Sequence, residues 1–411
     1  MRILHTADWH LGKSLEGNSR LDEQEKFLED FVNIVDENDV DLVIIAGDIY
    51  DTGNPPARAE KLFYSTLKKI SNGGKRAVLV IAGNHDNPER LIAAGPLADD
   101  HGIILLGTPK DVAEKGHYGD LLINDSGEGY IEIEMRGEKA VIIALPYPSE
   151  KRLNEIFTES TDEEERQISY SEKVAQIFAS LSSKYREDTI NIAVSHLFVA
   201  GGKESDSERP IQLGGSMAVD VSALPDKAQY IALGHLHKPQ IVSERSNIYY
   251  AGSPIQYSKS EIGYSKCCFI VDIKAGQEPD IRQVLFKNYK PIEVFKCSSI
   301  EDAIETCRQN KDRDIWAYIE IETDRTLTQS EIKEMKELLP DIVEIIPKIE
   351  GMDKEDEGLD MRERSMEELF RDFYMEKTGT ELSGELMDLF LDITKEEGGD
   401  DETQDAENIG A

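Results

Sequence analysis

The chain has 411 residues, of which 39% are hydrophobic, and carries 82 acidic and 46 basic side chains for a formal net charge of −36. It is longer than one hydrophobic core usually supports, has no run close to the roughly 20 apolar residues of a membrane span, and begins without a secretory signal, so we expect a multidomain cytoplasmic protein. Such acidity argues against a broad nucleic-acid-binding surface, so any binding to phosphates has to be local, assisted by metals or shared with a partner.

Five short apolar runs have the composition of strands that are buried on both faces, and each leads directly into a polar motif. These runs are Arg2–Thr6, Asp41–Ala46, Arg76–Ile81, Ile190–Val194 and Tyr230–Leu233. Two amphipathic helical patterns, Leu21–Glu37 and Pro56–Ile70, lie between the first three runs. Because strands and helices alternate here, the sequence predicts a mixed or parallel sheet.

A second sheet is indicated further along the chain, where apolar and polar residues alternate. Tyr130–Met135 and Ala140–Leu145 flank a turn and read as a hairpin. Further strands are predicted at Asn247–Ala251, Cys267–Ile273 and Ile281–Phe286. The predicted fold class is therefore α/β, a two-sheet α/β sandwich with outer helices.

The composition changes near residue 288, which we take as a domain boundary. Ile292–Ile349 then reads as strand, helix, strand, helix, strand, with capping signals at Ser299 and Thr328. The amphipathic helices near the end could fold back on this unit or bind a partner, and the acidic linker before them favours a partner. The predicted parts are a large α/β domain at 1–288, a small α+β capping domain at 289–350, an acidic linker at 351–364, C-terminal helices at 365–397 and a disordered acidic tail at 398–411.

The polar motifs contain pairs of side chains suited to binding metals. Asp8 and His10 follow the first run, and His235 and His237 follow the fifth. In extended backbone, residues two apart point the same way, so each pair can face one ion. Asp48 follows the second run and has two oxygens that could bridge two ions.

The remaining motifs add further ligand types and a group for proton transfer. Asn84, after the third run, offers a neutral oxygen, and His196 closes the fourth. His85 and Asp86 combine an imidazole with a carboxylate able to orient it. Any one such motif is as often surface polarity or a buried core histidine. Five motifs in order, each at the carboxyl end of a strand, predict a single binuclear metal site.

The order D-x-H, GDxxD, GNHD, a single His and GHxH resembles the calcineurin-like metallophosphoesterase superfamily over about the first 288 residues. Four longer strings are similar to the nuclease subunits of bacterial double-strand-break processing complexes. They are HTADWHLGK at His5–Lys13, GDIYDTGNPP at Gly47–Pro56, SDSERPIQLGG at Ser205–Gly215 and YIALGHLHKPQ at Tyr230–Gln240.

The resemblance implies a metal-dependent DNA nuclease that acts in break and hairpin processing, recombination and repair. Exonuclease activity at duplex ends and endonuclease activity on single strands are both implied. So are a coiled-coil ATPase partner and a homodimer within a heterotetramer. The nearest rival of the same fold is a phosphoprotein phosphatase or cyclic-nucleotide phosphodiesterase, since the metal chemistry is common to all of them.

Residue roles also follow from the resemblance. His85, oriented by Asp86, would stabilise or protonate the leaving oxygen. Mn²⁺ is the implied metal, although this ligand mixture also permits iron or zinc. Some relatives carry a second helper histidine where this chain has Asp51, so that role is not transferred. One metal would be held by Asp8, His10, Asp48 and His237, and the second by Asp48, Asn84, His196 and His235.

Overall fold

The computed structural model describes residues 1–156, 163–208, 218–242 and 245–349, together with positions 370, 371, 374, 386 and 387. The predicted linker at 351–364 and tail at 398–411 lie outside the described residues, as do the predicted helices at 365–397 except for those isolated positions. By its packing the chain divides into two units, Met1–Ile321 with Thr328–Ile346, and Glu322–Leu327 with Pro347–Ala411.

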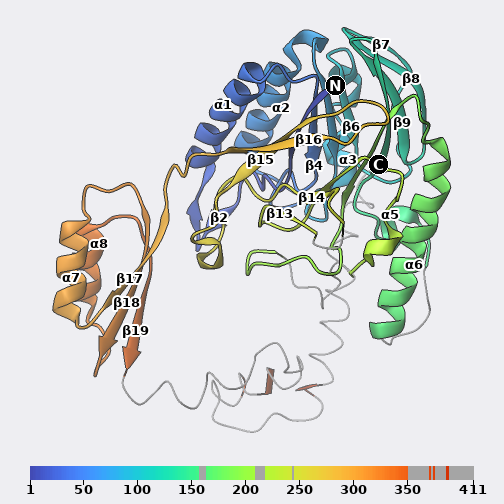
Figure 1. The fold of residues 1–411 in the computed structure, drawn as a ribbon. Helices are drawn as coiled ribbons and strands as arrows, with labels where there is room; N and C mark the ends of the chain where they lie inside the picture. Colours follow the sequence, from blue (N-terminus) through green and yellow to red (C-terminus); the bar gives the residue numbers. More distant parts are fainter. Residues whose placement is uncertain are drawn as a thin grey trace, which may run out of the picture. The chain divides into compact units, whose positions relative to one another are not determined.

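The first sheet is built largely from the early apolar runs (Figure 1). Its strands are β1 (Arg2–Thr6), β4 (Leu42–Ala46), β5 (Ala77–Ile81), β6 (Ile103–Leu106), β15 (Cys267–Asp272) and β16 (Asp280–Leu285). The order is β16-β15-β1-β4-β5-β6, with β1, β4, β5 and β6 parallel and β15 antiparallel to both neighbours. Helices α1 (Leu21–Glu37) and α2 (Ala57–Ser71) cover one face, where Phe31 and Phe63 are fully buried.

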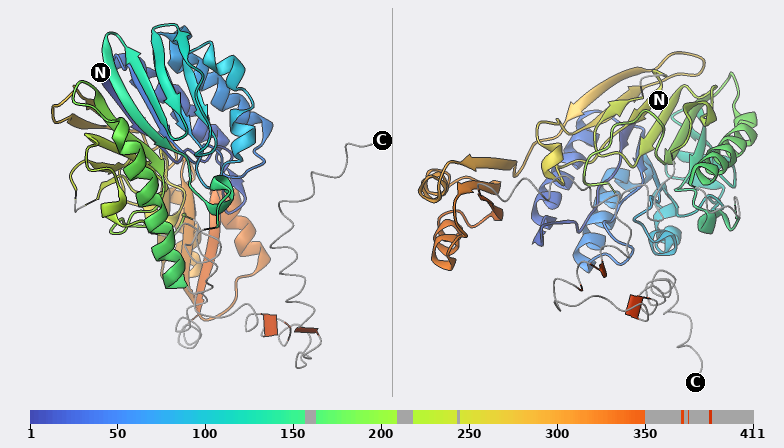
Figure 2. Two further views of the ribbon diagram at one scale, coloured as in Figure 1. Left: turned by 90° about the vertical axis from the view of Figure 1, so that its right-hand side faces the viewer. Right: turned by 90° about the horizontal axis from the view of Figure 1, so that it is seen from below.

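The second sheet contains the predicted hairpin. Its strands are β7 (Gly116–Tyr118), β8 (Leu121–Gly127), β9 (Tyr130–Met135), β10 (Glu138–Leu145), β11 (Ile190–His196), β12 (Tyr230–Gly234), β13 (Gln240–Ile241) and β14 (Ile248–Tyr250). They run in the order β13-β14-β12-β11-β10-β9-β8-β7. Helix α6 (Glu163–Leu181) covers the outer face, where Val174 and Phe178 pack with Val141 and Ile143 (Figure 2).

The two sheets face each other across an apolar core. Ile44 and Leu79 of the first sheet and Ile142 and Ile192 of the second belong to one buried apolar cluster. The central strands of each sheet are therefore buried on both faces, which explains why they read as continuous apolar runs. The predicted α/β sandwich with outer helices is confirmed, and each of the five apolar runs forms a strand.

Shorter elements join these layers. They are β2 (Ser14–Leu15), β3 (Asn18–Ser19), α3 (Pro88–Ile92), α4 (Gly95–Asp99), α5 (Glu150–Leu153) and the 3₁₀ turns Asn72–Gly74, Ser182–Lys184, Val221–Ala223 and Lys259–Glu261. None of the helices in the described part of the chain combines the length and apolar character that a bilayer-spanning segment needs.

Residues 292–349 follow the predicted order of strand, helix, strand, helix, strand. The elements are β17 (Ile292–Cys297), α7 (Ile300–Gln309), β18 (Trp316–Thr323), α8 (Gln329–Leu338) and β19 (Ile342–Ile349). Thr328 and Glu331 form a reciprocal capping box at the start of α8, as the sequence predicted. The Trp316 Nε1–H donates to Glu23 Oε2 of α1 at 2.7 Å, which ties β18 to the large sandwich. The proposed domain boundary at 288/289 stays a prediction.

Two glycines allow close backbone approaches where the polar motifs lie: Gly234 between the two sheets, and Gly83 between the loops that follow β5 and β4 of the first sheet. A Cβ atom on Gly234 would lie 1.9 Å from the carbonyl oxygen of Ala46, and one on Gly83 would lie 2.3 Å from the main-chain nitrogen of Asp48. Both neighbours are backbone atoms, which cannot swing aside as the end of a flexible side chain could. Glycine is therefore required at both positions by close packing.

Replacing Gly234 by Ala is expected to lower the free energy of unfolding by about 1–3 kcal/mol, because the added methyl group forces apart β12 and β4. Chemical denaturation monitored by circular dichroism measures the change. Gly95→Ala is the matched control, since a Cβ atom there meets nothing within 4 Å. Equal stability of Gly234→Ala and the unmodified protein would contradict the close approach.

Candidate metal centre

The five polar motifs converge where the two sheets meet. Three of them follow β1, β4 and β5 of the first sheet, and two end β11 and β12 of the second. His196 Nε2 lies 2.9 Å from Asn84 Oδ1, and the main-chain N–H of His235 donates to Asp8 Oδ1 at 2.9 Å. The site is thus shared between the ends of two sheets, rather than collected along the edge of one.

The backbone at four of the predicted ligands is left-handed. The φ angles are 53° at Asp8, 42° at His10, 49° at Asp48 and 107° at His235. The expectation that the D-x-H and H-x-H pairs lie in extended backbone is therefore wrong. Each strand instead ends in a sharp turn, and non-glycine residues in this region carry strain that is typical of functional sites.

Buried apolar residues anchor these turns. Trp9, between two predicted ligands, is fully buried and packs edge-on against Phe27, Phe31 and Phe63. Leu236, between His235 and His237 in the sequence, is likewise fully buried. In both motifs the middle residue packs in the hydrophobic core, and the two predicted ligands beside it extend toward the polar cluster.

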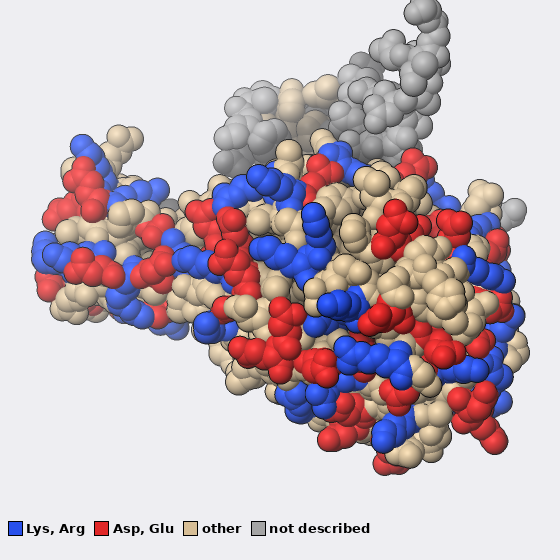
Figure 3. All heavy atoms as spheres, turned by 90° about the horizontal axis from the view of Figure 1, so that it is seen from above, with Lys and Arg blue, Asp and Glu red and all other residues tan. Residues whose placement is uncertain are grey.

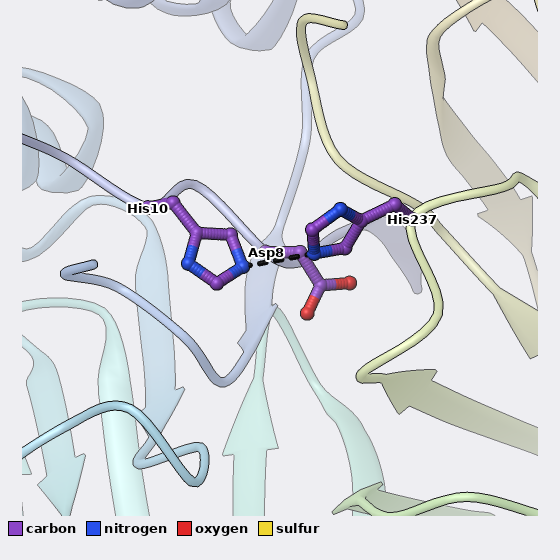
Figure 4. Close-up of side chains that lie close together, drawn as sticks. All are labelled: Asp8, His10 and His237. Atoms are coloured by element: carbon purple, nitrogen blue, oxygen red, sulfur yellow. Dashed lines mark hydrogen bonds between the residues drawn. The ribbon is translucent and has the colours of Figure 1, made fainter. Parts of the chain in front are cut away.

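Asp8, His10 and His237 form one candidate metal group (Figure 4). Their ligand atoms lie within 4.8 Å of one another, and all three side chains are buried. The Nε2 atoms of the two imidazoles are 3.0 Å apart. Asp8 Oδ2 is buried and has no hydrogen-bond partner among the described residues. Two converging imidazoles beside an unsatisfied carboxylate oxygen fit a divalent cation.

The second group lies directly beside the first. Asp48 Oδ2 is 3.4 Å from His196 Nε2 and 3.6 Å from His10 Nε2, so it faces imidazoles of both groups. Asn84 Oδ1 lies 3.2 Å from His235 Nδ1. The structure therefore brings all seven predicted ligands into one cluster, with Asp48 in its middle. Their division between two ions stays a prediction.

Burial makes charge costly in this cluster when no cation is bound. It raises the pKa of Asp8 to about 7 and lowers the pKa of His235 to about 3. Burial also opposes the charged form of His196, but the carboxylates of Asp48 and Asp8 and the carbonyl of Ala46 together outweigh it and raise the pKa of His196 to about 9. A divalent cation would stabilise both carboxylates and displace the His196 proton, so the cluster is suited to binding metal.

His85 adjoins the ligands but makes different contacts. Its Nδ1 lies 2.7 Å from the carbonyl oxygen of Asp51, and its Nε2 lies 3.9 Å from Asp48 Oδ2. The main-chain N–H of His85 donates to Asp48 Oδ1 at 2.9 Å. Among the described residues, the hydrogen-bond partner of the His85 ring is therefore the carbonyl of Asp51, where the sequence predicted the carboxylate of Asp86.

Asp86 holds the turn that carries Asp48. Its carboxylate accepts hydrogen bonds from the main-chain N–H groups of Ile49 at 3.1 Å, Tyr50 at 2.9 Å and Gly83 at 2.8 Å. Burial, followed by the nearby Asp48 charge, raises the pKa of Asp86 to about 6. These three hydrogen bonds connect the loop after β4 with the loop after β5, so we assign Asp86 a positioning role.

The residues that contact Nδ1 and the backbone of His237 were not predicted from the sequence. Ser207 Oγ lies 2.6 Å from His237 Nδ1, and Glu208 Oε1 accepts the His237 main-chain N–H at 2.7 Å. Glu261 and Lys266 complete the group. The string at Ser205–Gly215 contained the signal for the first two, because it is longer than catalysis alone requires. Nothing local in the sequence marks Glu261 or Lys266.

The surface in Figure 3 carries both signs of charge. On this face, lysine and arginine side chains alternate with acidic ones, and neither sign forms a continuous field. The overall excess of acid therefore does not exclude a locally favourable approach for a phosphate group.

The two-sheet sandwich, with a His/Asp/Asn cluster where its sheets meet, is typical of metal-dependent phosphoesterases. Residues 1–239 match the family described as calcineurin-like phosphoesterase, and residues 288–378 match the one described as type 5 capsule protein repressor C-terminal domain. The chain belongs to the calcineurin-like phosphoesterase family and, within it, to the group of SbcD nuclease subunits.

Two full-length relatives place it in that group. The SbcD subunit of nuclease SbcCD from Bacillus subtilis (strain 168) is 42% identical over 396 residues, which cover 96% of this chain and 97% of the relative. The SbcD subunit of nuclease SbcCD from Staphylococcus epidermidis (strain ATCC 12228 / FDA PCI 1200) is 27% identical over 383 residues, covering 93% and 95%. The similarity extends through both matched regions.

Proposed function

We propose that this chain is the nuclease subunit of an SbcCD-type complex, a phosphodiester hydrolase that cleaves DNA at a binuclear metal site. The observation that carries the proposal is the cluster in which His10 and His237 converge at 3.0 Å beside Asp8 Oδ2, a buried oxygen to which no described residue donates a hydrogen bond. Near-full-length similarity to SbcD subunits supports DNA as the substrate and disfavours a phosphatase or cyclic-nucleotide phosphodiesterase.

In this proposal the ligands divide between two ions that share Asp48. The first ion is held by Asp8, His10, Asp48 and His237, and the second by Asp48, Asn84, His196 and His235. Mn²⁺ is the proposed metal, because mixed imidazole and carboxylate oxygen ligands suit it. When bound, the two cations supply positive charge that attracts a phosphodiester and activates water.

His85 would handle the proton of the leaving oxygen. With its Nδ1–H donated to the carbonyl of Asp51, its Nε2 is the atom that can exchange a proton. Nε2 lies 3.9 Å from Asp48 Oδ2, at the border of the metal cluster. It is therefore close enough to reach an oxygen of a phosphodiester bound there, which is the first requirement for a general acid.

The proposal extends to partners. An SbcC-like coiled-coil ATPase would control access to the site, and the predicted C-terminal helices at 365–397 would bind it. We further propose that two copies form a homodimer within a heterotetramer, in the cytoplasm of a bacterium. The complex would act in DNA repair, recombination and replication. Exonuclease activity on duplex ends and endonuclease activity on single strands are both expected.

A substrate panel tests the proposal. The purified protein, alone and with an SbcC-type ATPase, is incubated with Mn²⁺ and labelled duplex DNA, a labelled hairpin, a phosphopeptide or a cyclic nucleotide. We expect DNA cleavage that stops when the metal is removed by a chelator and returns when Mn²⁺ is restored. Phosphopeptide turnover without DNA cleavage would instead support the phosphatase alternative.

A further inference from the structure

A chain of hydrogen-bonded polar groups contacts Nδ1 of His237, the ring nitrogen opposite the Nε2 that faces His10. Ser207 Oγ is 2.6 Å from His237 Nδ1 and also hydrogen bonds to Glu261 Oε1. Glu261 Oε2 forms an ion pair with Lys266 Nζ. Glu261 is fully buried and Lys266 is 6% exposed, so this is a charged pair held inside the protein.

Lys266 keeps Glu261 in the ionised state, because a buried carboxylate without a cation would be unfavourable. The Lys266 ammonium also donates to Ser253 Oγ and to the carbonyl oxygen of His237, each at 2.8 Å. Glu261 Oε1 accepts the main-chain N–H of Tyr257 at 3.1 Å. An ionised carboxylate can only accept hydrogen bonds, so the hydroxyl proton of Ser207 points to Glu261.

The direction of the hydrogen bond between Ser207 and His237 follows from that between Ser207 and Glu261. Ser207 has a single hydroxyl proton, and Glu261 takes it. Ser205 also lies near, at 3.0 Å, but it donates its own proton to Glu208 Oε2 at 2.7 Å. Ser207 must therefore accept a proton from His237 Nδ1, which makes the neutral ring the Nδ1–H tautomer.

This tautomer leaves the lone pair on Nε2, the atom that faces His10 Nε2. The opposite ring has no comparable support. His10 Nδ1 is buried with no hydrogen-bond partner among the described residues, and Asp51 Oδ1 is 3.6 Å away. Of the two converging imidazoles, only His237 has its Nδ1 bound, among the described residues, to a hydrogen-bonded group that includes the Glu261–Lys266 ion pair.

We propose that Ser207, Glu261 and Lys266 are positioning residues that hold His237 in the Nδ1–H tautomer and thereby set the affinity of this site for a divalent metal. The inference rests on the proposed function, which makes His237 a metal ligand. Partners that orient a metal-binding histidine typically contribute about 10- to 100-fold to metal affinity.

Ser207 offers the cleanest test, because Lys266 also supports the backbone of His237 directly. Ser207→Ala removes the acceptor, whereas Ser207→Thr retains a hydroxyl. Ser126→Ala is the matched control, since Ser126 Oγ likewise donates a hydrogen bond within the protein, to the carbonyl oxygen of Ala113. Mn²⁺ affinity is measured by calorimetry. The tautomer is read from histidine ¹⁵N shifts of the metal-free protein at alkaline pH, with His237→Asn assigning the signal.

We expect Ser207→Ala to weaken Mn²⁺ binding about 10- to 100-fold and to move the His237 signal away from the Nδ1–H tautomer. Ser207→Thr should restore both, and Ser126→Ala should change neither. A His237 ring protonated at Nε2 in the unmodified protein, or wild-type affinity in Ser207→Ala, would overturn the inference. If His237→Asn itself kept wild-type affinity, the ligand assignment of the proposed function would fail instead.

Discussion

Replacing His85 by Asn is expected to lower kcat for DNA cleavage by about 10²–10⁴-fold while both metals stay bound. The imidazole that would exchange a proton with the leaving oxygen is removed. The main-chain N–H that holds Asp48 Oδ1 at 2.9 Å is kept, so the central carboxylate should not move. Metal content by mass spectrometry and cleavage of labelled duplex DNA at saturating substrate measure the two effects.

The comparison variant is His237→Asn, which removes a proposed ligand. It should lose both metal and activity, because Asn cannot replace an imidazole nitrogen that lies 3.0 Å from His10 Nε2. The two variants therefore separate proton transfer from metal binding. If metal content fell equally in both, His85 would itself be a ligand, and the proposed division of roles would be wrong.

The strands and the convergence of the motifs could be predicted from the sequence because both depend on patterns within short segments. A sheet buried on both faces requires continuous apolar runs, and β4 with β5 satisfy that requirement residue by residue. The polar residue after each strand must lie near the end of its sheet. The clustering of all seven predicted ligands follows from these two facts.

The conformation inside the motifs could not be predicted, because it depends on contacts between distant segments. Asp8 adopts a positive φ in a turn whose carboxylate accepts the main-chain N–H of His235, 227 residues away. A rule for extended strands has no information about that contact. The same limit explains the misplaced partner of His85, since the carbonyl of Asp51 carries no side-chain signal.

The network behind His237 was missed for a related reason. Ser207, Glu261 and Lys266 come from three places in the chain, and each residue alone looks like an ordinary polar side chain. Burial is what distinguishes the charged pair: Glu261 is fully buried and Lys266 nearly so, and such residues are almost never buried unless they are paired. Burial of a charged residue is a property of the tertiary fold.

Replacing Asp48 by Asn is expected to abolish binding of both metals, with a loss of affinity of at least about 100-fold at each site. Residues that merely orient a ligand contribute about 10- to 100-fold, and a ligand shared by two cations should contribute more. The substitution keeps the size of the side chain but removes the negative charge that faces His196 at 3.4 Å and His10 at 3.6 Å. Calorimetric titration with Mn²⁺ measures the effect, and cleavage of duplex DNA should disappear with it.

Asp41→Asn is the matched control for this charge removal. Asp41 is also buried. It accepts the main-chain N–H of Arg2, the first residue of β1, at 2.7 Å and forms an ion pair with Arg136 at 2.8 Å. It should lower stability without changing metal affinity. A variant of Asp48 that still bound one Mn²⁺ with wild-type affinity would show that this carboxylate serves a single ion. The second ion would then depend on Asn84, His196 and His235 alone, which supply no negative charge to hold it in a buried site.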